Sequence, residues 1–175
     1  MKDRVCGPQC GCGHSGFHPA GSTVRVEVVD GTGRLPEGVL RGLEGQVRAA
    51  GAEISAAGEV RVRVVGDAEM DGLHRKHTGV AGTTDVLTFD LRDMGLGPLD
   101  VDIVVCLDEA QRQAGARGHG VERELLLYVV HGLMHCLGHD DHEEAACARM
   151  HAAEDALLTA IGVGPVYARP EGGGR

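Results

Sequence analysis

The densest group of titratable side chains is HGLMHCLGHDDH, residues 131–142, which holds four histidines and two aspartates. It follows an apolar run that should be buried. His131 and His135 are four residues apart, a rotation of about 400° on a helix, so both rings lie on one face. Two imidazoles placed in this way can reach one metal ion and are the usual helical half of a catalytic zinc site. The spacing therefore indicates a metal site.

A third ligand is expected just after the helix, because Gly138 allows the chain to reverse there. The residues that follow all carry possible ligand atoms: His139, Asp140, Asp141 and His142. Three protein ligands and one open position form the arrangement that activates water. Two interpretations need no metal. Histidines on an apolar helix can be satisfied core residues, and Asp141 with Glu144 matches a helix capping box.

Three stretches, TTDVLTFDL, DVDIVVC and HGLMHCLGHDD, occur in this order along the chain. They resemble two strands and the signature H-G-x-L-H-L-x-G-aromatic-D-H of the YbeY family, bacterial endoribonucleases of ribosomal RNA maturation and ribosome quality control. The resemblance covers about residues 59–161. Several motifs in the expected order are very unlikely to occur together by chance, so the combination is specific for the family. It implies a zinc-dependent endoribonuclease that cleaves single-stranded RNA, binds one zinc ion, and has ribosomal RNA and the small ribosomal subunit as partners.

The resemblance also orders the candidates for the third ligand. The family has a histidine at the position of Asp141, whereas here a histidine, His142, comes one residue later. The last helix keeps the family register without a gap and places Met150 where methionine is common, which favours Asp141 and leaves His142 as the alternate ligand. His139 is favoured least, because its position matches the family's aromatic residue. A carboxylate oxygen is an acceptable zinc ligand.

One departure from the family bears on catalysis. The family's arginine, thought to act on the RNA phosphate, corresponds to Thr78, and threonine supplies no cationic fork. Arg75 or Lys76 would have to substitute for it. The alternative is a non-catalytic ribosome-assembly or RNA-binding factor with a structural metal. A fourth protein ligand would favour that alternative, and an open cleft lined by residues 75–85 would favour catalysis.

Several neighbouring residues have simpler interpretations. Gly132 stands where the zinc peptidase motif H-E-x-x-H has its glutamate base, which disfavours a peptidase. Asp140 can orient an imidazole or serve as a turn residue. Cys106, Cys136 and Cys147 lie in apolar stretches and are expected to be small buried side chains. No catalytic side chain is assigned beyond the ligands.

Composition limits the possible partners. The chain has 175 residues, of which 42% are hydrophobic and 25% charged, and no apolar run reaches the roughly 18 residues of a membrane span. Its net charge of −9 disfavours non-specific binding to a polyanion, so RNA binding needs a local basic patch such as Arg61 with Arg63, or residues 73–77. No membrane association and no DNA partner are expected. The N-terminus lacks a secretory apolar core, which predicts a cytoplasmic location.

The elements that position these residues form one predicted α+β domain, residues 23–163. A flexible Cys- and Gly-rich extension is expected at 1–22 and a flexible tail at 164–175. Cys6, Cys10 and Cys12 of the extension match no standard zinc spacing, so disorder is favoured over a second metal site.

Periodicity predicts a mixed four-stranded sheet packed with helices. The strands are expected at 24–30, 59–66, 83–91 and 99–110, and the helices at 35–52, around Leu73, from Asp108, at 121–137 and at 142–161. The segment 121–137 is apolar on nearly every face, so it should be the central buried helix that carries the histidine pair.

Overall fold

A mixed sheet of four strands forms the centre of the computed structural model, which describes residues 23–167. The spatial order is β1 (Val24–Asp30), β2 (Gly58–Val65), β4 (Leu99–Cys106) and β3 (Val86–Asp90). The first three run parallel, and β3 pairs antiparallel with β4 at one edge. The predicted mixed four-stranded sheet is confirmed.

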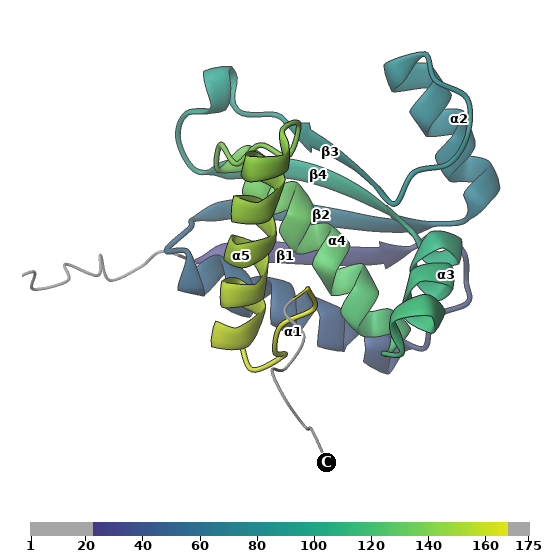
Figure 1. Ribbon diagram of the computed structural model, residues 1–175, viewed down its shortest axis with the longest axis horizontal. Coiled ribbons are helices and arrows are strands. Elements are labelled where there is room, and N and C mark those ends of the chain that lie inside the picture. Colours follow the sequence, from purple (N-terminus) through teal and green to yellow (C-terminus); the bar gives the residue numbers. More distant parts are fainter. Residues whose placement is uncertain (1–22, 168–175) are drawn as a thin grey trace, which may run out of the picture.

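Helices cover the two faces of this sheet unequally (Figure 1). The helices are α1 (Glu37–Glu53), α2 (Asp67–Thr78), α3 (Leu107–Arg117), α4 (Val121–Cys136) and α5 (Glu144–Ala160), with a short 3₁₀ turn η1 (Asp93–Gly95). Apolar side chains of α1, α4 and α5 join the large core on one face. On the other face α2 covers only the β3–β4 side, through Met70 and Leu73. The predicted α+β class is confirmed.

Strand burial follows from this unequal cover. In β1, Val24, Val26 and Val28 are buried and the residues between them are exposed, as expected of a strand with one covered face. The last four residues of β4 are all buried, because α2 covers the second face there. The strand ends at Cys106 and α3 begins at once, so the prediction of a strand reaching residue 110 was wrong.

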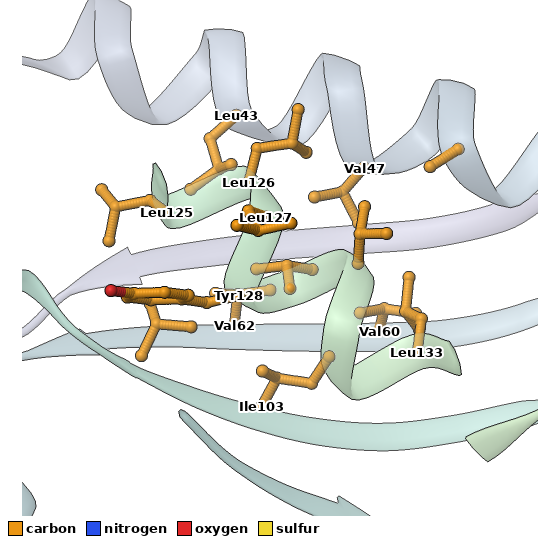
Figure 2. Close-up of a cluster of buried hydrophobic side chains, with 14 of the residues drawn as sticks. Leu43, Val47, Val60, Val62, Ile103, Leu125, Leu126, Leu127, Tyr128 and Leu133 are labelled. Carbon is orange, nitrogen blue, oxygen red and sulfur yellow. The ribbon is translucent and has the colours of Figure 1, made fainter. Parts of the chain in front are cut away.

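The central helix α4 packs beside α1 on the same face of the sheet (Figure 2). Leu125, Leu126 and Leu127 are at most 1% exposed, and Leu133 near the other end is also 1% exposed. Burying each such side chain contributes roughly 1.5–3 kcal/mol. This packing fixes the helix that carries His131 and His135, as predicted, and holds their end of it against the sheet.

Gly132 allows α4 to approach β3 closely. A Cβ atom at this position would lie 2.4 Å from Thr88 Oγ1 and 3.4 Å from Ile103 Cδ1. Any side chain here would push the helix away from the sheet. The glutamate of a peptidase motif therefore has no room at residue 132, in agreement with the sequence-based argument.

The segment that follows α5 packs on the domain. Residues 164–167, which fall in the segment predicted as a tail, pack on the domain: Arg123 donates to the Gly164 carbonyl at 3.0 Å, and the Tyr167 ring stacks on His151 at 3.8 Å. The predicted Cys6, Cys10 and Cys12 extension lies outside the described residues. Across residues 23–167, no helix is long and apolar enough to cross a membrane.

Candidate metal centre

His131, His135 and Asp141 converge at the C-terminal end of α4. The two Nε2 atoms are 3.2 Å apart, and Asp141 Oδ2 lies 3.7 Å from His131 Nε2 and 3.9 Å from His135 Nε2. One ligand atom from each of the three residues falls within 4.8 Å of the others, with the imidazole planes nearly perpendicular at 88°. We call these three residues the ligand group. The residues ranked first from sequence are thus brought together.

Both imidazoles are held by their other nitrogen. His131 Nδ1 lies 2.7 Å from Glu154 Oε1, and His135 Nδ1 lies 3.1 Å from the His139 carbonyl oxygen. A carboxylate or carbonyl only accepts, so in each neutral ring the proton belongs on Nδ1 and the Nε2 lone pair is left for a metal. The donor set of two imidazoles and one carboxylate suits zinc.

Glu154 sets the electrostatics of the pair. Its side chain is fully buried at the interface of α5 with α4. Burial lowers the pKa of His131, but the hydrogen bond and negative charge of Glu154 outweigh it, so this pKa lies above its ordinary value. A buried anion that favours positive charge on the ring also favours a cation at Nε2.

The sequence analysis missed Glu154 and considered Asp140 instead. Asp140 Oδ1 lies 2.5 Å from His142 Nδ1 and makes no contact with the histidine pair. The sequence did contain a feature that could have identified Glu154. It lies one helical turn after Met150, which is fully buried, and is therefore an acidic residue on an apolar helix face. An unpaired buried carboxylate is costly, so its presence there indicates a partner on a neighbouring element.

His142 and the capping interpretation are both disfavoured by geometry. The His142 side chain is 82% exposed and approaches Asp141 Oδ1 only at 3.5 Å. It groups with Asp140 and Asp141 rather than with the histidine pair. The N-cap of α5 is Glu143, and no side chain caps that end. Asp141 is therefore not engaged in the predicted capping box.

A cavity of about 720 Å³, the first cavity, opens at the ligand group. Its lining includes Thr78, Thr84 and Asp85, which lie in or next to the predicted cleft segment, and Thr88 and Asp90 from β3. Three of its lining residues are aspartates, and the described residues contribute no lysine or arginine to it. An anionic substrate in this cavity would therefore need a bound cation.

The last turn of α2 brings basic residues near this cavity without placing them in its lining. Arg75 is paired with Asp71 at 2.8 Å, and its side chain is 61% exposed. His77 packs its ring edge against Phe89 of β3, 4.8 Å between centroids. Thr78, at the family's arginine position, is the α2 residue that reaches the cavity wall. Arg75 is thus a neighbour of the cavity and not a direct replacement in its lining.

The other predicted basic patch is largely neutralised. Arg61 on β2 pairs with Asp100 and Asp102 of β4, and Arg63 lies 3.0 Å from Glu69. Cross-strand pairs of this kind cancel the local charge. The uncovered sheet face is therefore not a free cationic surface for RNA.

Of the three described cysteines, Cys106 fits the expected buried role, whereas Cys136 and Cys147 are only partly buried. Cys106 is fully buried, and burial raises the pKa of its thiol. Burial also raises the pKa of Cys136 to about 11. Cys147 is only partly buried, with its sulfur 3.6 Å from His151 Nε2. No cysteine belongs to the ligand group.

Comparison with known proteins places the chain in a family. The model of the family "Endoribonuclease YbeY" matches residues 38–162. The curated Endoribonuclease YbeY of Moorella thermoacetica is 37% identical over 128 residues, which are 67% of this chain and 82% of that protein. The Bacillus licheniformis protein of the same name is 31% identical over 150 residues, 79% of this chain and 95% of its own length.

A solved structure agrees at the level of the fold. The solution structure of TM1509 from Thermotoga maritima superimposes with a TM-score of 0.53 at 23% identity, covering 86% of this chain and all of that one. The match of the family model over most of the chain, together with relatives above 30% identity, is decisive for the family. The chain belongs to the YbeY endoribonuclease family.

Proposed function

We propose that this protein is a zinc-dependent endoribonuclease that cleaves single-stranded RNA, with one zinc ion held by His131, His135 and Asp141. The observation that carries the proposal is the convergence of three ligand atoms beside an open cavity of about 720 Å³. Among the described residues the ligand group has three members, which is the ligand count of a catalytic zinc site rather than a closed structural one. Family membership supports the endoribonuclease activity.

The residues of the chain have separate tasks in this proposal. Glu154 accepts the Nδ1 proton of His131 and fixes its tautomer, and the His139 carbonyl does the same for His135. When bound, zinc supplies a Lewis acid that activates water near neutral pH. The hydroxyl of Thr88 lines the same cavity and can donate to a phosphate oxygen.

The wider role rests on the family. We assign ribosomal RNA as substrate, the small ribosomal subunit as partner, ribosome quality control as the process and the cytoplasm as location. Residues 23–163 are the proposed catalytic domain, and residues 164–167 pack on it. Residues 1–22 and 168–175 are proposed as an extension and a tail outside it. Cleavage of ribosomal RNA precursors by the purified protein tests the substrate assignment.

Metal content tests the ligand assignment. The wild type, Asp141→Ala and His142→Ala, purified identically and supplied with zinc, are compared by plasma mass spectrometry. We expect one zinc ion per chain in the wild type and in His142→Ala, and loss of zinc in Asp141→Ala. Loss in His142→Ala alone would make His142 the third ligand, and a wild type without zinc would refute the metal site.

A second candidate is a non-catalytic ribosome-assembly or RNA-binding factor with a structural metal. It is favoured by Thr78 at the family's arginine position and by a cavity lining with three aspartates and, in the part of the chain described, no basic residue. A labelled single-stranded RNA separates the two candidates. Zinc-loaded wild type should cleave it and His135→Ala should not, whereas binding without cleavage by the wild type supports the assembly factor. Thr78→Arg should raise the cleavage rate of a true nuclease.

A further inference from the structure

A second cavity, of about 330 Å³, adjoins the first. Thr84 and Asp85 line both cavities, so this short segment before β3 is their common wall. The rest of the second cavity is lined by Thr83, by three residues of α3 and by one of α4: Glu109, Gln113, Arg117 and Tyr128. No residue of the ligand group contributes to it.

The α3 wall is polar and held in place. Glu109, Gln113 and Arg117 are spaced four residues apart and so share one face of the helix. Gln113 Nε2 donates to Glu109 Oε1 at 2.8 Å, and Arg112 donates to the other oxygen at 2.8 Å. The Gln113 amide is thereby oriented, and its oxygen accepts no hydrogen bond from the described residues.

Arg117 is held in place by Glu124 and Tyr167, which do not line the second cavity. Its Nη1 donates at 2.7 Å to Glu124, whose side chain is fully buried, and its guanidinium carbon lies 5.6 Å from the Tyr167 ring centroid. The Glu124 carboxylate offsets the charge of the arginine. Arg117 can still donate through its remaining N–H groups, but it does not make the cavity cationic.

The opposite side offers one free acceptor, on Asp85, and one buried hydroxyl, on Tyr128. Asp85 Oδ1 accepts from Val86 N at 2.9 Å and from Thr84 Oγ1 at 3.0 Å, while Oδ2 accepts none among the described residues. Tyr128 is 4% exposed, and its hydroxyl makes no well-formed hydrogen bond in the described part of the chain. Burial, then the charge of Glu124, raises the pKa of Tyr128, and a hydrogen bond toward Glu124 acts in the same direction, so the hydroxyl stays protonated beside that carboxylate.

These groups suit a neutral, planar, polar ligand better than a phosphate. Asp85 and Glu109 repel an anion, and Arg117, which lines the same cavity, is already paired with Glu124. Ligand sites start at roughly 300 Å³, which one nucleobase can occupy. Bases of single-stranded RNA are recognised by hydrogen bonds to their edges, and an exocyclic amino group is the natural partner of a carboxylate oxygen.

We propose that the second cavity binds one nucleobase of the RNA strand, next to the phosphate at the ligand group, and that Asp85 and Gln113 read an amino-bearing base edge. The common wall supplies the continuity that a single strand needs to occupy both cavities. This inference rests on the proposed function and adds a base preference to it. Adenine, guanine and cytosine fit, and uracil, which has no amino group, fits less well.

Nucleosides test this separately from cleavage, because they carry no phosphate. The full-length, zinc-loaded, ¹⁵N-labelled protein is titrated with adenosine, guanosine, cytidine and uridine and followed by NMR. We expect saturable shifts at residues 83–85 and at Gln113 with at least one amino-bearing nucleoside, and weaker binding of uridine. Gln113→Leu should weaken binding about three- to tenfold, the usual effect of losing one hydrogen bond.

Gln111→Leu is the matched control, because it makes the same change at an exposed position on the same helix. Tyr128→Phe is a second variant that removes one hydroxyl with little change in volume. The inference is overturned if no nucleoside gives saturable shifts, if the shifts centre on the ligand group, or if both leucine variants weaken binding equally. RNA cleavage without nucleoside binding refutes the base site alone. Nucleoside binding without cleavage refutes the nuclease and keeps the base site.

Discussion

Glu154→Gln should weaken zinc binding about tenfold while leaving the fold intact. The buried Glu154 carboxylate accepts from His131 Nδ1 at 2.7 Å. The glutamine oxygen can still accept that proton, so the variant removes the charge and keeps the geometry. Hydrogen bonds to charged groups contribute about 1.5–3 kcal/mol and neutral ones about 0.5–1.5 kcal/mol. The difference of about 1.4 kcal/mol corresponds to a factor of ten in affinity.

Glu154→Ala should have a larger effect, because it also removes the acceptor. His131 Nδ1 would then face an apolar interface without a partner, and the ring would lose its fixed orientation. Loss of such outer partners typically lowers metal affinity by 10- to 100-fold, and we expect the upper end of that range. Thermal unfolding of the metal-free variants separates this effect from general destabilisation.

Competition with a chromophoric zinc chelator at fixed pH gives the affinities. Asp140→Asn is the control, because that carboxylate is 62% exposed and contacts His142 rather than the histidine pair. Its zinc affinity should match that of the wild type. The reasoning is refuted if Glu154→Gln binds zinc as tightly as the wild type, or if Asp140→Asn loses as much affinity.

Three further predictions concern stability. Gly132→Ala should lower the free energy of unfolding by up to about 2 kcal/mol, because the clash with Thr88 Oγ1 outweighs the helix propensity of alanine, and Thr88→Ala should restore part of it in urea unfolding. Leu133→Ala should cost about 2–5 kcal/mol in the same assay, since the side chain is 1% exposed in the core. The hydrogen bond from Arg112 lowers the pKa of Asp67 to about 2, below its unfolded value of about 3.9, so Asp67 stabilises the fold above about pH 4 and loses this effect as the pH falls. In Asp67→Asn the free energy of unfolding should therefore fall less steeply between about pH 4 and 2 than in the wild type. If it falls as steeply as in the wild type, Asp67 is not stabilised by Arg112.

The features of the metal centre that depend on short spacing along the chain could be predicted from the sequence. The four-residue spacing of His131 and His135 fixes their common face once the segment is helical, and the apolar run before them predicts burial of that helix. Resemblance to the YbeY family favoured Asp141 over His142, and its distance to both rings agrees with that order.

Other predictions failed where a neighbouring element decided the outcome. The strand expected at 83–91 begins only at Val86, where pairing with β4 starts, and before it only the Asp85 carbonyl still accepts from Cys106 N, at 2.8 Å. Thr84 and Asp85 form the common wall of the two cavities instead. Asp140 lies next to the histidines in sequence, but it pairs with His142. Periodicity describes one segment at a time and contains no information on which helix packs beside it.

The sequence by itself determined the secondary-structure pattern, the central helix, the histidine pair and the family resemblance, because each depends on residue types at short spacing. Only the tertiary structure decided that Glu154 of α5 holds His131, and that Thr78 and Asp85 reach the same cavity. Glu154 is 23 residues from His131, and Thr78 and Asp85 lie more than 40 residues before the ligand group. They meet because the helices must bury their apolar faces against the sheet and against one another, and that packing is a property of the whole fold.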